Sequence, residues 1–368
     1  MKNKPIPWYF PKTGAYEKEL INKVIESNYL NDGDYTRLFE KKVAQFLGVR
    51  HCVGVTSGTA AITLSLMGMG IGRDDEVIVP DLTFIATANA VRLAGARVKL
   101  LDIEPDRFAI DVELIRKSIG PRTKAIVSVD VNGRAACYEL LEPLAKKNGL
   151  VLICDATEGL GSRYNGRCLG TFGDAGCFSF SANKTVTTGQ GGMIATNNTK
   201  LYYRILELKD QGRRFQGTGG NDLHPVIGYN FKLTNLQSAV GIAQLKRLPA
   251  RLTQAKNRDK WYQEAFSGCP GIVLPSLKNE AGEVAQWADI LVDDREKIQS
   301  TLSKLNIGSR PFWYPLHTQK PYFKKERGFS NASAVSRRGL WLPSYFDLTK
   351  KQVERISHLI RRVLEKKS

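Results

Sequence analysis

A lysine and an aspartate are the residues of this sequence best placed to carry out chemistry. Lys184 follows the apolar stretch 178–180 and precedes a turn rich in glycine and threonine. An amine held away from water gives up its proton more readily and can then attack a carbonyl carbon. A lysine in a loop is far more often simply exposed, so Lys184 alone does not define a site.

Asp155 ends the apolar run 150–154, so we expect it at the carboxyl end of a buried strand. In a parallel sheet, this is the edge where ligands bind. A carboxylate in such surroundings is costly unless a cation or hydrogen-bond donors accompany it. The alternative is that Asp155 caps a following helix, and its position alone does not separate the two interpretations.

Two further segments are suited to an anionic, planar ligand. The segment 56–61 runs from a strand end through Gly58 and Thr59 into a helical pattern. Backbone N–H groups and the helix dipole at such a start favour a phosphate. Phe84 follows the next expected strand and could stack on a planar ring. Taken singly, a plain helix cap and a core aromatic explain these residues about as well.

Together these four features meet the needs of one cofactor, pyridoxal 5′-phosphate (PLP). PLP needs a phosphate cradle, a stacking aromatic, a carboxylate for its pyridinium nitrogen and a lysine that forms a Schiff base. The carboxylate keeps the ring nitrogen protonated, so that the ring can accept electrons when a Cα–H bond of the substrate breaks. The residues therefore predict a PLP site.

The elements that must position these residues form an alternation of strands and helices. We expect strands at 51–55, 76–80, 98–102, 124–130, 150–155, 176–180 and 192–196. Helical patterns between them include 59–68, 86–94 and 139–147. This alternation predicts an α/β fold with a mostly parallel central sheet covered by helices on both faces.

The alternation of strands and helices ends after residue 196. A polar, glycine-rich stretch at 204–224 is expected to be a long loop, and a helix follows at 234–248. We expect residues 1–245 to form a large PLP-binding domain. The N-terminal segment of this range could pack on the smaller domain. Residues 246–368 would form this smaller domain, of the α+β class, which ends in a basic amphipathic helix at 349–368. The cleft between the domains is the expected place for the site.

Composition narrows the class of protein further. The chain has 368 residues, and 42% are hydrophobic, which excludes global disorder. No apolar run reaches about 18 residues and no signal-peptide pattern opens the chain, so we expect a cytoplasmic protein without a membrane span. The six scattered cysteines lack Cys-x-x-Cys spacing and indicate reduced thiols, with neither disulfides nor a metal site.

The charge of the chain is strongly positive. Lys and Arg number 54 and Asp and Glu 36, which gives a formal net charge of +18. Such a surplus favours anionic partners, among them phosphate-bearing small molecules. The basic residues are spread along the chain without a zinc-finger or RNP-type motif, so we expect a solvated basic surface and no nucleic-acid binding.

Ordered motifs over nearly the whole chain resemble the DegT/DnrJ/StrS family of sugar aminotransferases. The motifs lie at 56–61, 77–84, 155–158, 173–180, 183–192, 228–231, 310–317 and 342–344. Many motifs in order are more specific than any single pattern. The resemblance implies a fold-type I PLP-dependent transferase, with a large domain around a mostly parallel sheet and a smaller C-terminal α+β domain.

The resemblance also implies roles around the PLP ring. Lys184 would form the Schiff base with the cofactor and move a proton between cofactor and substrate carbons. Asp155 would pair with the pyridinium nitrogen, and Phe84 would lie against the ring. Glu158 falls where relatives often have Gln or His near the ring hydroxyl.

Further roles concern the phosphate, the partner subunit and the substrate. Gly58, Thr59 and Ser179 would hold the phosphate. Asn230 resembles a residue that reaches the phosphate of the neighbouring subunit, which implies a homodimer with shared active sites.

The substrate side of the pocket is less well defined. Tyr314 and His317 resemble residues that line the sugar side. The segments 130–134 and 181–182 depart from the usual family pattern. These departures leave the PLP chemistry untouched but leave the identity of the sugar open.

The resulting hypothesis is a transaminase that moves an amino group from L-glutamate to a nucleotide-linked 4-keto-6-deoxyhexose. The amino sugar would serve cell-surface polysaccharide. Alternatives are a non-nucleotide keto-sugar acid as acceptor, and a non-catalytic, anion-binding regulatory protein. A related dehydratase would carry His in place of the lysine, so Lys184 argues against that activity.

Overall fold

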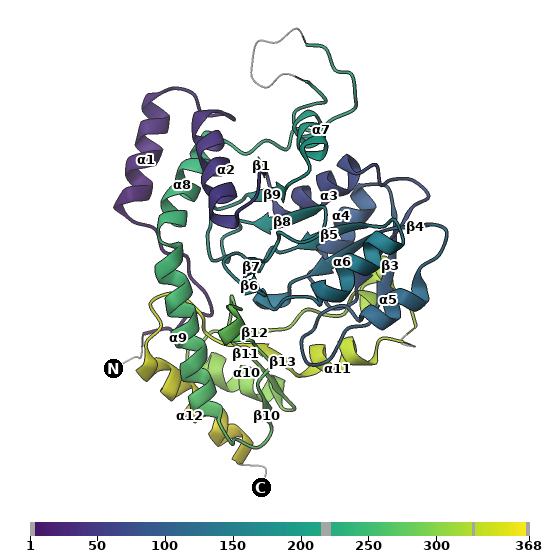
Figure 1. Ribbon diagram of the computed structural model, residues 1–368. Coiled ribbons are helices and arrows are strands. Elements are labelled where there is room, and N and C mark those ends of the chain that lie inside the picture. The colour runs from purple at the N-terminus through teal and green to yellow at the C-terminus, as the bar shows by residue number, and fades with distance from the viewer. Residues whose placement is uncertain (1–3, 215–221, 326–327, 366–368) are drawn as a thin grey trace.

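A seven-stranded sheet forms the centre of the computed structural model, which describes residues 4–214, 222–325 and 328–365 (Figure 1). The strand order is β1-β9-β8-β5-β4-β2-β3. The strands are β1 (His51–Val55), β2 (Glu76–Pro80), β3 (Arg97–Leu101), β4 (Thr123–Val129), β5 (Val151–Asp155), β8 (Ala175–Ser179) and β9 (Gly192–Thr196). Only the two pairs that include β9 are antiparallel. The predicted α/β fold with a mostly parallel sheet is confirmed.

Helices cover both faces of this sheet, because both faces are apolar. Along β4 and β5, Ile126 and Leu152 pack into one core, while Val127 and Ile153 pack into the other. The first face is covered by α1 (Ala15–Glu26), α2 (Asp34–Leu47), α5 (Val112–Ser118), α6 (Tyr138–Lys147) and α8 (Asn235–Lys246). The second is covered by α3 (Gly58–Gly68), α4 (Ala86–Leu93) and α7 (Thr199–Lys209).

A second, antiparallel sheet lies in the C-terminal part of the chain. Its order is β10-β11-β13-β12, from β10 (Ile272–Val273), β11 (Asp289–Val292), β12 (Arg310–Pro311) and β13 (Gly339–Trp341). The helices of this part are α9 (Leu248–Phe266), α10 (Arg295–Lys304), α11 (Ser330–Arg338) and α12 (Lys350–Glu365). The C-terminal helix α12 lies at this end of the molecule (Figure 1).

The N-terminal segment joins this second part, through a bridge between Ile6 and Ile307. α8 leads almost directly into α9 (Figure 1). The domain boundary at 245 stays a prediction. A short hairpin, β6 (Arg163–Tyr164) and β7 (Arg167–Cys168), completes the strands of the described residues. No helix in those parts of the chain is long and apolar enough to cross a bilayer.

One expectation was wrong. The start of the expected loop at 204–224 is helical, because α7 continues to Lys209. Leu201, Ile205 and Leu208 recur at helical spacing and are buried against the core that contains α3. Their apolar stripe outweighs the polar residues between them. Residues 215–221 lie outside the described residues.

The two sheets are joined by a buried polar contact. Arg134 forms two 2.7 Å hydrogen bonds with the carboxylate of Asp289, and both side chains are at most 5% exposed. Asn132 donates to the Trp287 carbonyl and accepts from the Trp287 N–H, both at 2.8 Å. Gly133 has a φ of +81°, and a Cβ there would lie 2.2 Å from the Val284 carbonyl oxygen.

We therefore expect Asp289→Asn to lower the free energy of unfolding by about 3–5 kcal/mol, because it leaves the Arg134 charge buried without a counterion. Urea denaturation at pH 7 measures this. The matched control is Glu113→Gln, which breaks an exposed pair with Arg116 and should cost less than about 1 kcal/mol. Equal costs for the two variants would show that the buried pair does not hold the sheets together.

Candidate active site

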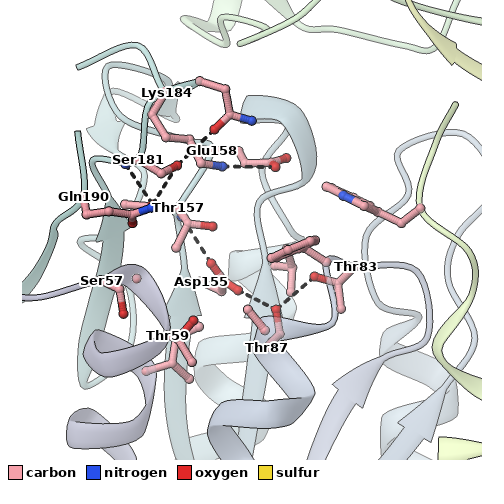
Figure 2. Close-up of a pocket in the computed structure, with 18 of the residues that line it drawn as sticks. Ser57, Thr59, Thr83, Thr87, Asp155, Thr157, Glu158, Ser181, Lys184 and Gln190 are labelled. Carbon is pink, nitrogen blue, oxygen red and sulfur yellow. Dashed lines mark hydrogen bonds and ion pairs between the residues drawn. The ribbon is translucent and has the colours of Figure 1, made fainter. Parts of the chain in front are cut away.

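A cavity of about 300 Å³ lies at the carboxyl ends of the central strands, beneath residues of the second sheet (Figure 2). Val129, Asp155 and Ser179 reach it from the ends of β4, β5 and β8. Trp287, Arg310 and Trp313 close it from the C-terminal part. Seven residues predicted for the PLP site line this cavity: Gly58, Thr59, Phe84, Asp155, Glu158, Ser179 and Lys184.

Lys184 is held inside the cavity by contacts at both ends of the residue. Its Nζ lies 3.3 Å from the Glu158 Oε1 and 5.1 Å from the centre of the Trp287 ring. Its backbone carbonyl accepts a 2.7 Å hydrogen bond from the Tyr9 hydroxyl. The side chain is only 11% exposed. The amine is thus kept from bulk water and aimed at the cavity, as Figure 2 shows.

Glu158 is a buried carboxylate with two partners. Besides Lys184, its Oε2 accepts a 2.9 Å hydrogen bond from the Asn132 N–H. Burial raises the pKa of the Glu158 carboxyl, and the Lys184 amine and the Asn132 N–H offset this only in part. Asn132 belongs to the segment 130–134, which departs from the family pattern and does not line the cavity. It acts on the site through Glu158 and Trp287.

Asp155 is buried at the end of β5 with neutral partners only. The Thr87 hydroxyl donates to Oδ2 at 2.7 Å, and the Thr157 N–H donates to Oδ1 at 3.2 Å. Burial raises the pKa of the Asp155 carboxyl, and these bonds, with the nearby Lys184, offset this in part. The ion pairs of the described residues do not include Asp155, so the site offers room for a cationic group. No helix follows Asp155, so it is not a helix cap.

The N-terminus of α3 forms an anion cradle. The Ser57 side chain accepts from the Ala60 N–H at 3.1 Å, and the first N–H groups of the helix, those of Gly58 and Thr59, have no intrahelical partner. A Cβ on Gly58 would lie 2.9 Å from the Thr157 Cγ2 and 3.1 Å from the Ser179 Cβ, so a larger residue here would force these side chains to shift. The helix dipole adds positive potential at the same point.

These features fit PLP. The cradle suits its phosphate, Asp155 suits its pyridinium nitrogen, and Lys184 suits its aldehyde. Phe84 is 52% exposed at the edge of the cavity, in reach of a planar ring.

Three predicted residues do not line the cavity of a single chain. Asn230 is exposed, and Tyr314 is 67% exposed. His317 is buried, where its Nδ1 lies 2.6 Å from the Asp81 Oδ2 and its ring stacks on Phe329. The roles of all three stay predictions.

Sequence reasoning missed several residues of the site. Thr87 and Thr157 solvate Asp155. Thr157 lies within the motif 155–158 and Thr87 three residues after the motif 77–84, but no role was predicted for either. Trp287 lies in a region without a recognisable pattern. Arg310 is the first residue of a family motif, but no sequence pattern indicated its role.

The fold and the site define a PLP-dependent transferase of fold type I. The family model for the DegT/DnrJ/EryC1/StrS aminotransferases matches residues 11–361. The chain belongs to this aminotransferase family, and it is an enzyme, which excludes the non-catalytic alternative.

Curated and solved relatives agree with this assignment. GDP-perosamine synthase of Escherichia coli O157:H7 is 36% identical, covering 95% of this chain and 96% of that protein. GDP-perosamine synthase of Vibrio cholerae is 34% identical, covering 97% and 98%. The PLP form of Spr1654 from Streptococcus pneumoniae superimposes with a TM-score of 0.93 at 25% identity, covering 98% and 99%. The enzyme uses PLP.

We expect Asp155→Asn to lower kcat by at least about 100-fold, because a neutral amide cannot stabilise positive charge on the ring nitrogen. Steady-state transamination measures this, with thermal unfolding as a check on folding. Asp111→Asn is the matched control, because Asp111 caps α5 and asparagine caps helices as well. An Asp155→Asn enzyme with near-parental kcat would contradict the assignment.

Proposed function

We propose that this enzyme transfers the amino group of L-glutamate to a nucleotide-linked 4-keto-6-deoxyhexose, forming a 4-amino sugar for cell-surface polysaccharide. One observation carries the proposal. A single cavity holds a lysine amine beside a buried carboxylate, a second buried carboxylate with room for a cation, and an anion cradle. This set serves amino-group transfer.

The reacting groups of the chain have distinct tasks. PLP, when bound, supplies an electrophilic aldehyde and a ring that accepts electrons. Lys184 Nζ would take the proton from the donor Cα and pass it to the cofactor, and in the sugar half-reaction it would take a proton from the cofactor and pass it to the sugar carbon. Glu158 Oε1, 3.3 Å away, stabilises the ammonium that Lys184 forms between these steps. The Trp287 ring beside Nζ keeps water from it.

The acceptor is proposed from two supports. The relatives of highest identity among those described are GDP-perosamine synthases, whose name specifies a GDP-linked amino sugar. The net charge of +18 would also draw a diphosphate toward the enzyme. A keto-sugar acid without a nucleotide would gain less from that field.

We further propose a homodimer with shared active sites. The segment before Asn230 presents two large apolar side chains to solvent in the single chain: Leu223 is 67% exposed and Ile227 is 86% exposed. Two such side chains close together in one segment, beside a residue expected to cross to a partner, support burial against a second copy.

Two half-reactions test the proposed activity. L-glutamate should abolish the visible absorbance of the lysine-bound cofactor, and a GDP-linked 4-keto-6-deoxyhexose should restore it. Lys184→Ala is the control and should show neither change, because the base and the attachment point are both lost. Restoration by a keto-sugar acid, with none by any nucleotide-linked keto-sugar, would overturn the acceptor assignment.

Light scattering tests the dimer. The active enzyme should have the mass of two chains, and Ile227→Asp should shift it toward one chain of 41.0 kDa with a parallel loss of activity. Leu305→Asp, at a less exposed apolar residue that directly follows α10, is the control and should stay dimeric. A fully active parent enzyme with the mass of one chain would refute the proposal.

A further inference from the structure

One cation among the charged residues that line the cavity has no role in the proposed reaction. The lining includes the carboxylates of Asp155 and Glu158 and the cations Lys184 and Arg310. Lys184 pairs with Glu158, and Asp155 faces the place of the ring nitrogen. The ion pairs and side-chain hydrogen bonds of the described residues do not include Arg310. Its guanidinium N–H donors are therefore not used by the described residues, and the residue lines the cavity.

Arg310 is nevertheless held in place. It starts β12, opposite Trp341 of β13, and is half-buried. Its guanidinium carbon lies 5.3 Å from the centre of the Trp8 ring and 5.8 Å from that of Trp341. Contacts with aromatic faces orient a guanidinium without using its N–H donors. The residue is thus oriented as an anion-binding group before any ligand arrives.

A buried arginine of the C-terminal half, Arg258, gives a comparison for the half-buried Arg310. Arg258 is buried and bonded to Asp259 and to three backbone carbonyls, those of Ala285, Gln286 and Ser344. Arg310 has no such partners, although Trp313 and Trp287 of the same cavity wall lower the local polarity. A half-buried guanidinium in these surroundings gains most from an anionic ligand.

The anion is not the cofactor phosphate, because the cradle for that group is at the N-terminus of α3, on the central sheet. Two anions remain: the carboxylate of the amino donor and the diphosphate of the acceptor. In an amino acid, the carboxylate is attached to the carbon that carries the reacting amine. In a 4-keto sugar nucleotide, the diphosphate is attached across the ring from the reacting carbon. A residue of the same cavity as Lys184 suits the first.

We propose that Arg310 binds the carboxylate of the amino-acid donor through paired N–H···O bonds, oriented by Trp8 and Trp341. This proposal rests on the proposed transamination. It makes Arg310 the residue that lets one cavity accept the donor as well as the sugar.

Separate half-reactions of the holoenzyme test it. In Arg310→Gln, the half-saturating concentration of L-glutamate should rise at least about tenfold, equivalent to about 1.4 kcal/mol of lost binding. Arg310→Lys should recover part of this, because the charge remains without the bidentate geometry. The half-saturating concentration of the nucleotide keto-sugar, measured from the amine form of the cofactor, should stay within about twofold. The control, Arg337→Gln, removes an exposed arginine of α11 and should change neither.

A second measurement does not depend on amino transfer. Glutarate, a dicarboxylate without an amine, should quench or shift the tryptophan fluorescence of the holoenzyme, and Arg310→Gln should weaken its binding. An increase confined to the keto-sugar constant would assign Arg310 to the diphosphate and overturn the proposal. Unchanged constants for glutamate and glutarate would also overturn it. If the parent transfers no amine yet glutarate binding still requires Arg310, the proposed function fails and the carboxylate site stands.

Discussion

The burial of one carboxylate, that of Asp155, is the constraint on which the rest of the site depends. A negative charge at the end of a buried strand is costly, and the hydrogen-bond donors that the described residues bring to it include the Thr87 hydroxyl and the Thr157 N–H. Thr83, 3.0 Å from the Thr87 hydroxyl, orients that donor in turn. The arrangement is incomplete in electrostatic terms, since no ion pair of the described residues includes Asp155 and the nearby Lys184 offsets the cost of burial only in part. A protonated pyridine ring would complete it, and the same interaction would support the capacity of the cofactor to accept electrons.

The surrounding fold places the other groups relative to this carboxylate. The parallel strands end at one edge, so Asp155 and Ser179 lie on the same side of the cavity. Gly58 and Gly192 allow the start of α3 and strand β9 to approach closely, since a Cβ on Gly192 would lie 2.3 Å from the Ser57 carbonyl oxygen. The opposite wall comes from the second sheet, whose position is set by buried contacts with 132–134. The cavity therefore lies between the carboxyl ends of the central strands and residues of the C-terminal part.

The sequence predicted the parts of this picture that depend on local pattern. Apolar runs located the strands of the central sheet, and residues at their carboxyl ends, such as Asp155, followed from the topology of parallel sheets. Trp287 could not be found this way, because it reaches the cavity through a contact with Asn132, 155 residues away in the chain. Arg310 is recognisable only by the absence of a counterion, which needs coordinates. The helical start of 204–224 was missed because its apolar stripe is interspersed with charged residues.

The most direct test of the central claim is the protonation state of the cofactor ring nitrogen in the holoenzyme. ¹⁵N-labelled PLP allows this to be read by nuclear magnetic resonance as the pH is raised. With the buried Asp155 carboxylate as its partner, the nitrogen should stay protonated from about pH 6 to about pH 9, because a nearby opposite charge stabilises the charged form. A nitrogen that reads as unprotonated across this range would contradict the account, since Asp155 would then not be its charge partner.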